Sequence, residues 1–274
     1  MAGGVLAIDG KTLRRPFDPA AVRSPLPVVT ASGAGGRRAI GPSAVPQGGN
    51  GITAARALLE TLSLDGGAGD RRCGWHIQSD TAQVILERGG DYLFALKGNH
   101  PLLMREVAEY FASPPEKLAK FQTVDADPGR IGTGVHRLSH EADWLFPDRR
   151  YKDEPRLPGL AMIACVQSSR QTGESLTTAT RCHVSSTRLT PDAVATALPA
   201  HWSVENRLHR VLTTSFDEDR ARTRTDNSPE NVSILRKPPL NILRKARPKR
   251  PVSRNRKHAG WSDDVAKPIL GQMR

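Results

Sequence analysis

Short apolar runs broken by glycine-rich turns mark the first fifty residues. The run at 5–8 ends at Asp9, a pattern typical of a buried strand that places an acid at its carboxyl end. Two more strands are expected at 26–31 and 38–45, joined by the turn at 32–36. The chain is therefore predicted to open with an antiparallel meander.

Apolar residues at helical spacing alternate with further short apolar runs up to residue 111. Helices are expected at 52–64, 81–88 and 102–111, and strands at 75–77 and 92–96. Strands that alternate with helices in this way predict an α/β fold whose sheet contains both antiparallel and parallel pairs.

The middle of the chain has a less regular pattern. Residues 125–158 are rich in proline, glycine and charge, which favours a solvated loop or insertion, with a phosphate-contacting segment as the alternative. A strand pair is expected at 160–167 and 178–184. Thr190 followed by Pro191 is typical of a helix start, with Thr as the N-cap and Pro in the first turn.

An apolar stripe and a row of polar residues share the segment 201–212. In the polar row, His201, Glu205 and His209 recur every four residues on one predicted helix face. A carboxylate held between two imidazoles on a rigid helix can bind a metal ion or accept a proton; the alternative is an ordinary amphipathic helix. The apolar stripe consists of Trp202, Val204, Leu208, Val211 and Leu212.

The charge balance points to a polyanionic partner. Lys and Arg number 40 against 28 Asp and Glu, which gives a net charge of +12, and the pI is near 10.2. Nucleic acid is the first candidate and an anionic membrane surface the second. Because aromatic residues make up only 5% of the chain, binding to the phosphate backbone is favoured over base stacking. The cluster Asp217, Glu218 and Asp219 is expected to be a solvated turn.

Three cysteines, Cys73, Cys165 and Cys182, are scattered without a Cys-x-x-Cys pair. They indicate neither a disulfide framework nor a zinc site, and they suit a reducing cytoplasm. The first residues lack the basic region of a secretory signal. No apolar run approaches the ~20 residues that cross a bilayer, so no membrane association through a spanning segment is expected.

Motifs spread over nearly the whole chain resemble the transposases of the ISAs-type insertion sequences, also called H-repeat-associated proteins. The matching stretches are 7–15 (Ala-Ile-Asp-Gly-Lys-Thr-Leu-Arg-Arg), 89–92 with 96–99, 129–131, 201–209, Phe216 with Glu218-Asp219, 230–236 and 259–264. Their order and compatible spacing make the set far more specific than any one member.

This resemblance implies a ribonuclease-H-like mixed sheet flanked by helices, in which an Asp-Asp-Glu set binds two divalent cations, Mg²⁺ or Mn²⁺. The implied chemistry is strand cleavage at element ends followed by transfer to target DNA. Asp9 matches the first acid and Glu205 the third. Lys97, after a buried strand, stands where a cation contacts substrate phosphate.

The position of the family's second acid holds Cys73. A thiol is a poor ligand for Mg²⁺, which requires hard oxygen donors. Asp70 and Asp80 are nearby, but a shift of three residues turns a side chain to the other face of a strand, and Asp80 lies seven residues further on. The chain is accordingly expected to be a truncated, partly degenerate copy, in which the region that usually precedes the first acid is absent.

The resemblance and the charge together give the expected plan of the protein. A catalytic domain is expected at 1–235, with an insertion of loops and strands at about 112–188, followed by a basic, flexible tail at 236–274. The tail is predicted because residues 236–257 contain ten basic and no acidic residues.

The expected function is that of an insertion-sequence DNA transposase, cytoplasmic and nucleoid-associated in a bacterium, with impaired catalysis and a homo-oligomer as an open possibility. The alternatives are a catalytically dead DNA-binding remnant and a general nucleic-acid-binding protein, although a binding module has no need for Asp9 and Glu205 in a metal-binding cleft. The residues expected to contact DNA are Lys11, Arg14, Arg15, Lys97, Arg130, Arg236, Lys237, Arg244 and Lys245.

Overall fold

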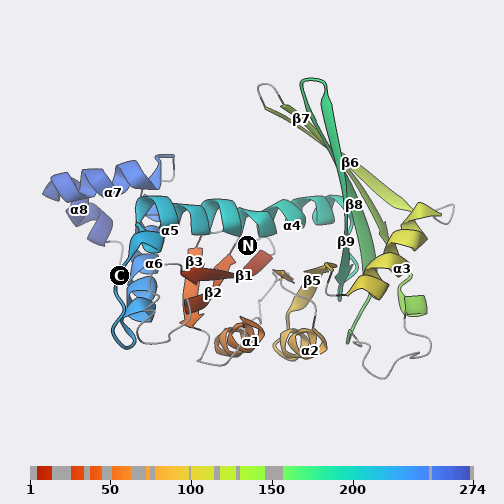
Figure 1. The fold of residues 1–274 in the computed structure, drawn as a ribbon, viewed down its shortest axis with the longest axis horizontal. Coiled ribbons are helices and arrows are strands. Elements are labelled where there is room, and N and C mark those ends of the chain that lie inside the picture. Colours follow the sequence, from red (N-terminus) through yellow and green to blue (C-terminus); the bar gives the residue numbers. More distant parts are fainter. Residues whose placement is uncertain are drawn as a thin grey trace. The chain divides into compact units, whose positions relative to one another are not determined.

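A computed structural model of the chain has a mixed α/β fold (Figure 1). It describes residues 5–13, 26–33, 38–44, 51–62, 72–74, 78–98, 100–113, 118–127, 130–145, 157–246 and 249–271. The chain divides into two compact units: unit 1 is Met1–Gly3 with Ser63–Pro199, and unit 2 is Gly4–Leu62 with Ala200–Arg274.

Unit 2 contains the predicted meander. Strands β1 (Val5–Leu13), β2 (Leu26–Gly33) and β3 (Arg38–Ala44) pair antiparallel in the order β3-β2-β1, which confirms the prediction. Asp9 lies within β1, opposite Thr30 of β2, rather than at the end of the strand. Because side chains alternate along a strand, Asp9 shares its face of the sheet with Lys11.

Helices cover this small sheet. Helix α1 (Gly51–Thr61) packs on β2 and β3, while the segment η2 (Val204–His209) packs on β1. The core beneath η2 and the following helix α5 (Arg210–Ser215) is built from Ala7, Ala39, Val204, Leu208, Leu212 and Leu240. Burying one such leucine contributes about 1.5–3 kcal/mol. The predicted apolar stripe is thus confirmed at its buried positions.

The central helix differs from the expected regular α-helix. Helix α4 (Pro191–Ser203) starts where Thr190 and Pro191 predicted, but Val204–His209 is a π-helical turn. A π-helix forms i→i+5 hydrogen bonds, so the four-residue repeat that placed His201, Glu205 and His209 on one face is not kept there. The helix is therefore wider at residues 204–209, where it packs on β1. Such π-helical turns occur frequently at functional sites.

The expectation of a flexible tail from residue 236 is wrong. Helix α6 (Ser228–Ala246) runs across that boundary, and α7 (Val252–Trp261) and α8 (Asp263–Leu270) follow it. Asn241 of α6 donates to the carbonyl of Ala39 and accepts from its N–H, each at 2.8 Å, so it closes the edge of β3. A few buried residues, among them Leu240 and Leu243, outweigh the basic composition that suggested disorder.

Unit 1 contains the remaining described strands. Strand β4 (Arg72–Gly74) pairs parallel with β5 (Asp91–Ala95). Antiparallel neighbours then follow β5 in the order β9 (Ser175–Ser185), β8 (Met162–Thr172), β7 (Arg130–Ser139) and β6 (Ala119–Asp127). Helices α2 (Ser79–Glu87) and α3 (Pro101–Ala112) confirm two predictions, whereas the strand predicted at 75–77 lies outside the described residues. A short 3-10 turn, η1 (Asp143–Leu145), completes this unit.

Part of the predicted loop at 125–158 is strand. Strand β7 (Arg130–Ser139) pairs with β6 (Ala119–Asp127) on one side and β8 (Met162–Thr172) on the other. Pairing on both edges satisfies the backbone of this glycine-containing strand, an effect that local composition does not reveal. The strand pair predicted at 160–167 and 178–184 is confirmed as β8 and β9 (Ser175–Ser185).

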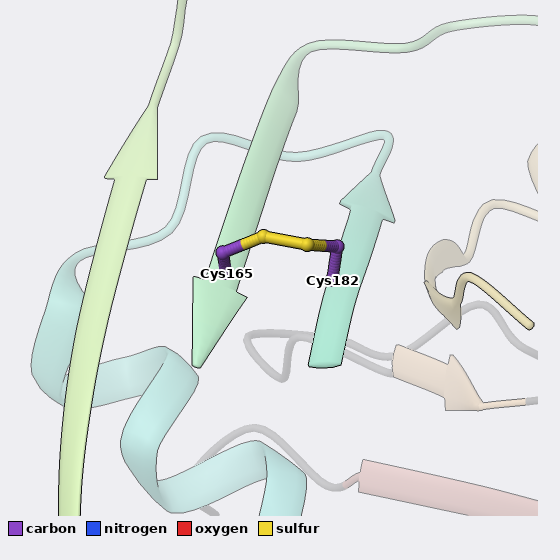
Figure 2. Close-up of a disulfide and its surroundings, with 2 residues drawn as sticks. All are labelled: Cys165 and Cys182. Carbon is purple, nitrogen blue, oxygen red and sulfur yellow. A yellow bond between two sulfur atoms is a disulfide. The ribbon is translucent and has the colours of Figure 1, made fainter. Parts of the chain in front are cut away.

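A disulfide joins two of the cysteines, contrary to the expectation of none. Cys165 of β8 and Cys182 of β9 stand directly opposite in the antiparallel register, with their Cα atoms 4.1 Å apart, and their sulfur atoms are bonded (Figure 2). Cross-strand neighbours can lie far apart in the sequence, so spacing along the chain gave no sign of this pair. Among the described residues, no helix is long and apolar enough to cross a membrane.

Candidate functional site

Asp9 presents a carboxylate that solvent can reach. Its side chain is 41% exposed, and its Oδ1 accepts a hydrogen bond of 2.9 Å from the N–H of Gly10. The strand holds the Cα, while this short backbone contact orients one oxygen. The second oxygen, Oδ2, points toward the π-helical segment.

His209 is the neighbour of that second oxygen. Its Nε2 lies 3.2 Å from Asp9 Oδ2, yet neither ring nitrogen has a hydrogen-bond partner within the described structure, and both are buried. The contact is one of proximity rather than an aligned hydrogen bond. Buried polar nitrogens without a partner are rare and point to an additional group at the site.

Glu205 belongs to the same helical turn as His209. Val204, which precedes it, and Leu208 pack against Ala7, two residues before Asp9 in β1. The backbone that carries Glu205 therefore lies beside the strand that carries Asp9, within one unit. The side chain of Glu205 lies outside what the structure describes.

Lys11, on the same face of the sheet as Asp9, forms ion pairs with two carboxylates. Its Nζ lies 3.0 Å from Glu218 Oε2 and 2.9 Å from Asp219 Oδ1, and it donates to Thr213 Oγ1 at 2.6 Å. Both acids belong to the 3-10 turn η3 (Glu218–Arg220). The expectation of a solvated acidic turn is wrong for Glu218, which is only 1% exposed. The charge of Lys11 is used inside the protein, so its contact with DNA remains a prediction.

Lys237 completes this buried network from helix α6. Its ammonium donates to Ser233 Oγ at 2.6 Å and to the Ser233 carbonyl at 3.0 Å, and it lies 3.7 Å from Glu218 Oε1. The Ser233 hydroxyl in turn donates to Glu218 Oε1 at 3.2 Å. No sequence pattern indicated this network, although Glu218 was among the residues that carry the resemblance. Two lysines facing Glu218 and Asp219 leave the cluster electrically balanced.

Burial lowers the pKa of Lys237 from 10.5 to about 8, against the opposing effect of Glu218. Between these values the unfolded chain binds more protons at this residue than the folded chain, so the free energy of unfolding rises with pH. We expect it to rise from pH 7 to pH 10 by up to about 3 kcal/mol more in the native protein than in Lys237→Met. Urea unfolding of both proteins across this range measures the difference; parallel pH profiles would contradict it.

Three other residues predicted to contact DNA, all on α6, make contacts within the protein. Lys237 is 3% exposed, so its assignment to DNA binding is wrong: its charge is taken up by the buried network. Arg236 Nε donates to the Phe216 carbonyl at 3.2 Å, and Arg244 donates to the Arg207 carbonyl.

The remaining predicted contacts are either exposed or outside the described part of the chain. Lys97 and Lys245 are exposed. Arg14 and Arg15 lie outside the described residues, as does the side chain of Arg130.

The position expected for the second acid lies in unit 1. Cys73 belongs to β4 and stands opposite Tyr92 in the parallel register, but its side chain lies outside the described part. Asp70 also falls outside it, and Asp80 is an exposed residue in the first turn of α2. The described residues contain no group of three potential metal ligands.

Comparison with known proteins identifies the family. The model of the transposase DDE domain matches residues 2–236. The chain is 31% identical over 244 residues to "Putative protein YbfL" and to "H repeat-associated putative transposase YhhI" of Escherichia coli K12, and 31% identical over 248 residues to "Putative transposase YncI" of Escherichia coli O157:H7. These matches cover 87%, 87% and 88% of this chain but 64%, 64% and 62% of the relatives, so the chain spans just under two thirds of their length. The chain belongs to the DDE transposase domain family.

Proposed function

We propose that this chain is the catalytic part of an insertion-sequence DNA transposase with a ribonuclease-H-like core, in which Asp9 and Glu205 share a divalent cation. One observation carries the proposal: β1, which bears Asp9, packs against the π-helical turn that bears Glu205. These residues are almost two hundred positions apart in sequence. Family membership makes DNA the expected substrate.

The residues present fit Mg²⁺ or Mn²⁺. Asp9 offers hard carboxylate oxygen and is open enough for a hydrated ion to approach. Mg²⁺ typically keeps several waters and uses one or two protein carboxylates, so Asp9 and Glu205 are enough protein ligands for one ion. The unpartnered ring nitrogens of His209 beside Asp9 are suited to hold one of those waters.

Each residue has a defined task in this proposal. Asp9 and Glu205 would hold one cation, which, with a second cation, would activate the attacking oxygen and stabilise the leaving oxygen of a phosphodiester. The Gly10 N–H orients the Asp9 carboxylate, and His209 lies beside its second oxygen. Lys97, exposed after β5 in unit 1, remains a proposed contact with a DNA phosphate.

Metal binding by calorimetry tests the site directly. We expect the native protein to bind Mn²⁺ and Asp9→Ala to bind it more than about tenfold more weakly, because loss of a residue that merely orients a ligand already costs 10–100-fold. Glu60→Ala, which removes an exposed acid from α1, serves as the matched control. Equal heats for the native protein and Asp9→Ala would exclude this site.

A second candidate function is DNA binding without strand cleavage. The resemblance assigns Cys73 to the position of the family's second acid, and a thiol does not replace a carboxylate for Mg²⁺. The net charge of +12 supports attachment to DNA whatever the state of the catalytic residues. On this basis we propose that catalysis by this copy is impaired while its affinity for DNA is retained.

A further inference from the structure

Helix α7 is fixed to unit 2 by one of its faces. Val252 packs against the core below η2 and α5. Asn255 is buried, and its side-chain amide donates to the carbonyl of Leu243 at 3.4 Å. The guanidinium of Arg256 lies 5.5 Å from the centre of the Phe216 ring. These contacts determine which residues of α7 face solvent.

The opposite face of α7 carries a stripe of cations. Arg254, Lys257 and Trp261 follow at spacings of three and four residues, so they share one side of the helix. Arg250 lies just before Pro251, the N-cap of the helix, and adds a further cation near the start of α7. All four are exposed, with Trp261 78% exposed. No acidic residue occurs from 249 to 261; the next is Asp263.

The cations of α6 are not equally available. Lys237 is buried, Arg236 binds the Phe216 carbonyl, and Arg244 binds the Arg207 carbonyl. By contrast, no ion pair to Arg250, Arg254 or Lys257 is found within the described ranges. The exposed cations of this C-terminal region therefore include Arg250, Arg254 and Lys257 in and beside α7, together with Lys245, Lys249 and Lys267 on either side of it.

We propose that Arg250, Arg254, Lys257 and Trp261 form a surface that binds the phosphate backbone of duplex DNA. This rests on the proposed function, since it assigns the DNA of that reaction to a particular helix. The 10 residues of α7 span about 15 Å, and duplex DNA carries one charge per about 1.7 Å of axis, so the stripe faces several phosphates. Trp261 supplies an apolar surface at the end of the stripe for a deoxyribose.

Salt dependence of DNA binding tests the proposal. In the triple variant Arg250→Gln/Arg254→Gln/Lys257→Gln, we expect the slope of log K against log salt to fall by about 2.7, or about 0.9 for each phosphate that is no longer neutralised. Fluorescence anisotropy with a labelled duplex measures this slope. All three positions face solvent, so the melting temperature should stay that of the native protein.

A control variant with the same loss of net charge shows whether the position of the cations on α7 matters. Lys120→Gln/Arg170→Gln/Arg188→Gln removes three exposed cations from unit 1 and should leave the slope near its native value. An equal fall in both variants, or no fall in the α7 variant, would overturn the stripe while leaving DNA binding intact. If the native protein fails to bind duplex DNA even at low salt, the proposed function falls as well.

Tryptophan fluorescence gives an independent reading. Because Trp261 lies on the stripe, saturating duplex DNA should change the emission of the native protein, and most of that change should disappear in Trp261→Phe. A change that persists undiminished in Trp261→Phe would show that DNA does not cover this face of α7.

Discussion

Glu218→Gln is expected to lower the free energy of unfolding at pH 7 by about 3 kcal/mol, since breaking a buried ion pair by removing one partner costs 3–5 kcal/mol. Glutamine keeps the shape and still accepts from Ser233, but it leaves Lys237 buried without its carboxylate. Lys11 keeps Asp219 as a partner, which limits the loss. Urea unfolding gives the value directly.

The control for this substitution is Asp217→Asn, one residue earlier. Asp217 is exposed and 3.9 Å from Arg220, a surface contact worth at most about 1 kcal/mol. Its φ of 50° suits asparagine, so little change is expected. A loss as large as that of Glu218→Gln would mean that burial of the charge is not the cause.

A double-mutant cycle checks the same point from the other side. The double variant Glu218→Gln/Lys237→Met leaves no charge at either position. It should therefore be more stable than Glu218→Gln alone, in which Lys237 is buried without its carboxylate. The penalty of Glu218→Gln should also shrink at pH 10, because Lys237 then sheds its proton in the folded state. Strictly additive effects at both pH values would show that the two residues are not coupled.

Local patterns were sufficient for most elements of the fold. The meander β1–β3, helix α3 and the start of α4 follow from alternation, helical spacing and one N-cap sequence. Strand β7 did not, because its glycines and charges are compensated by two neighbouring strands. Helices α6–α8 did not either: their basic composition says little about the few residues that anchor them, such as Leu240 and Asn255.

The candidate site divides in the same way. Asp9 and Glu205 were predicted from motifs as ligands of one ion, and the elements that carry them, β1 and η2, pack against each other. The network of Lys11, Glu218 and Lys237 was missed, since an acidic turn in a basic chain gives no sign of which acid is buried. The π-helical turn at 204–209 was also missed, because apolar spacing does not distinguish a single widened turn from regular α-helix.

Strand cleavage by the native protein is expected to be undetectable, whereas Cys73→Asp should restore it in part. The reason is chemical: aspartate supplies the hard oxygen donor that Mg²⁺ requires and the thiol lacks. The substrate is a supercoiled plasmid that carries the DNA flanking the gene, incubated with Mn²⁺, and nicked product is followed on gels. We expect at least about a hundredfold more nicking than the background of the native protein, within the range by which catalytic groups act.

Two further substitutions decide whether a restored activity belongs to this site. Cys73→Ser keeps the size of the side chain without a carboxylate and should remain inactive. Asp9→Asn, added to Cys73→Asp, should abolish the nicking, because the proposed function requires both acids. Robust cleavage by the native protein would show that Cys73 does not occupy the position of the second acid. Nicking that survives Asp9→Asn would instead remove Asp9 from the catalytic set, and with it the significance of its contact with the turn that carries Glu205.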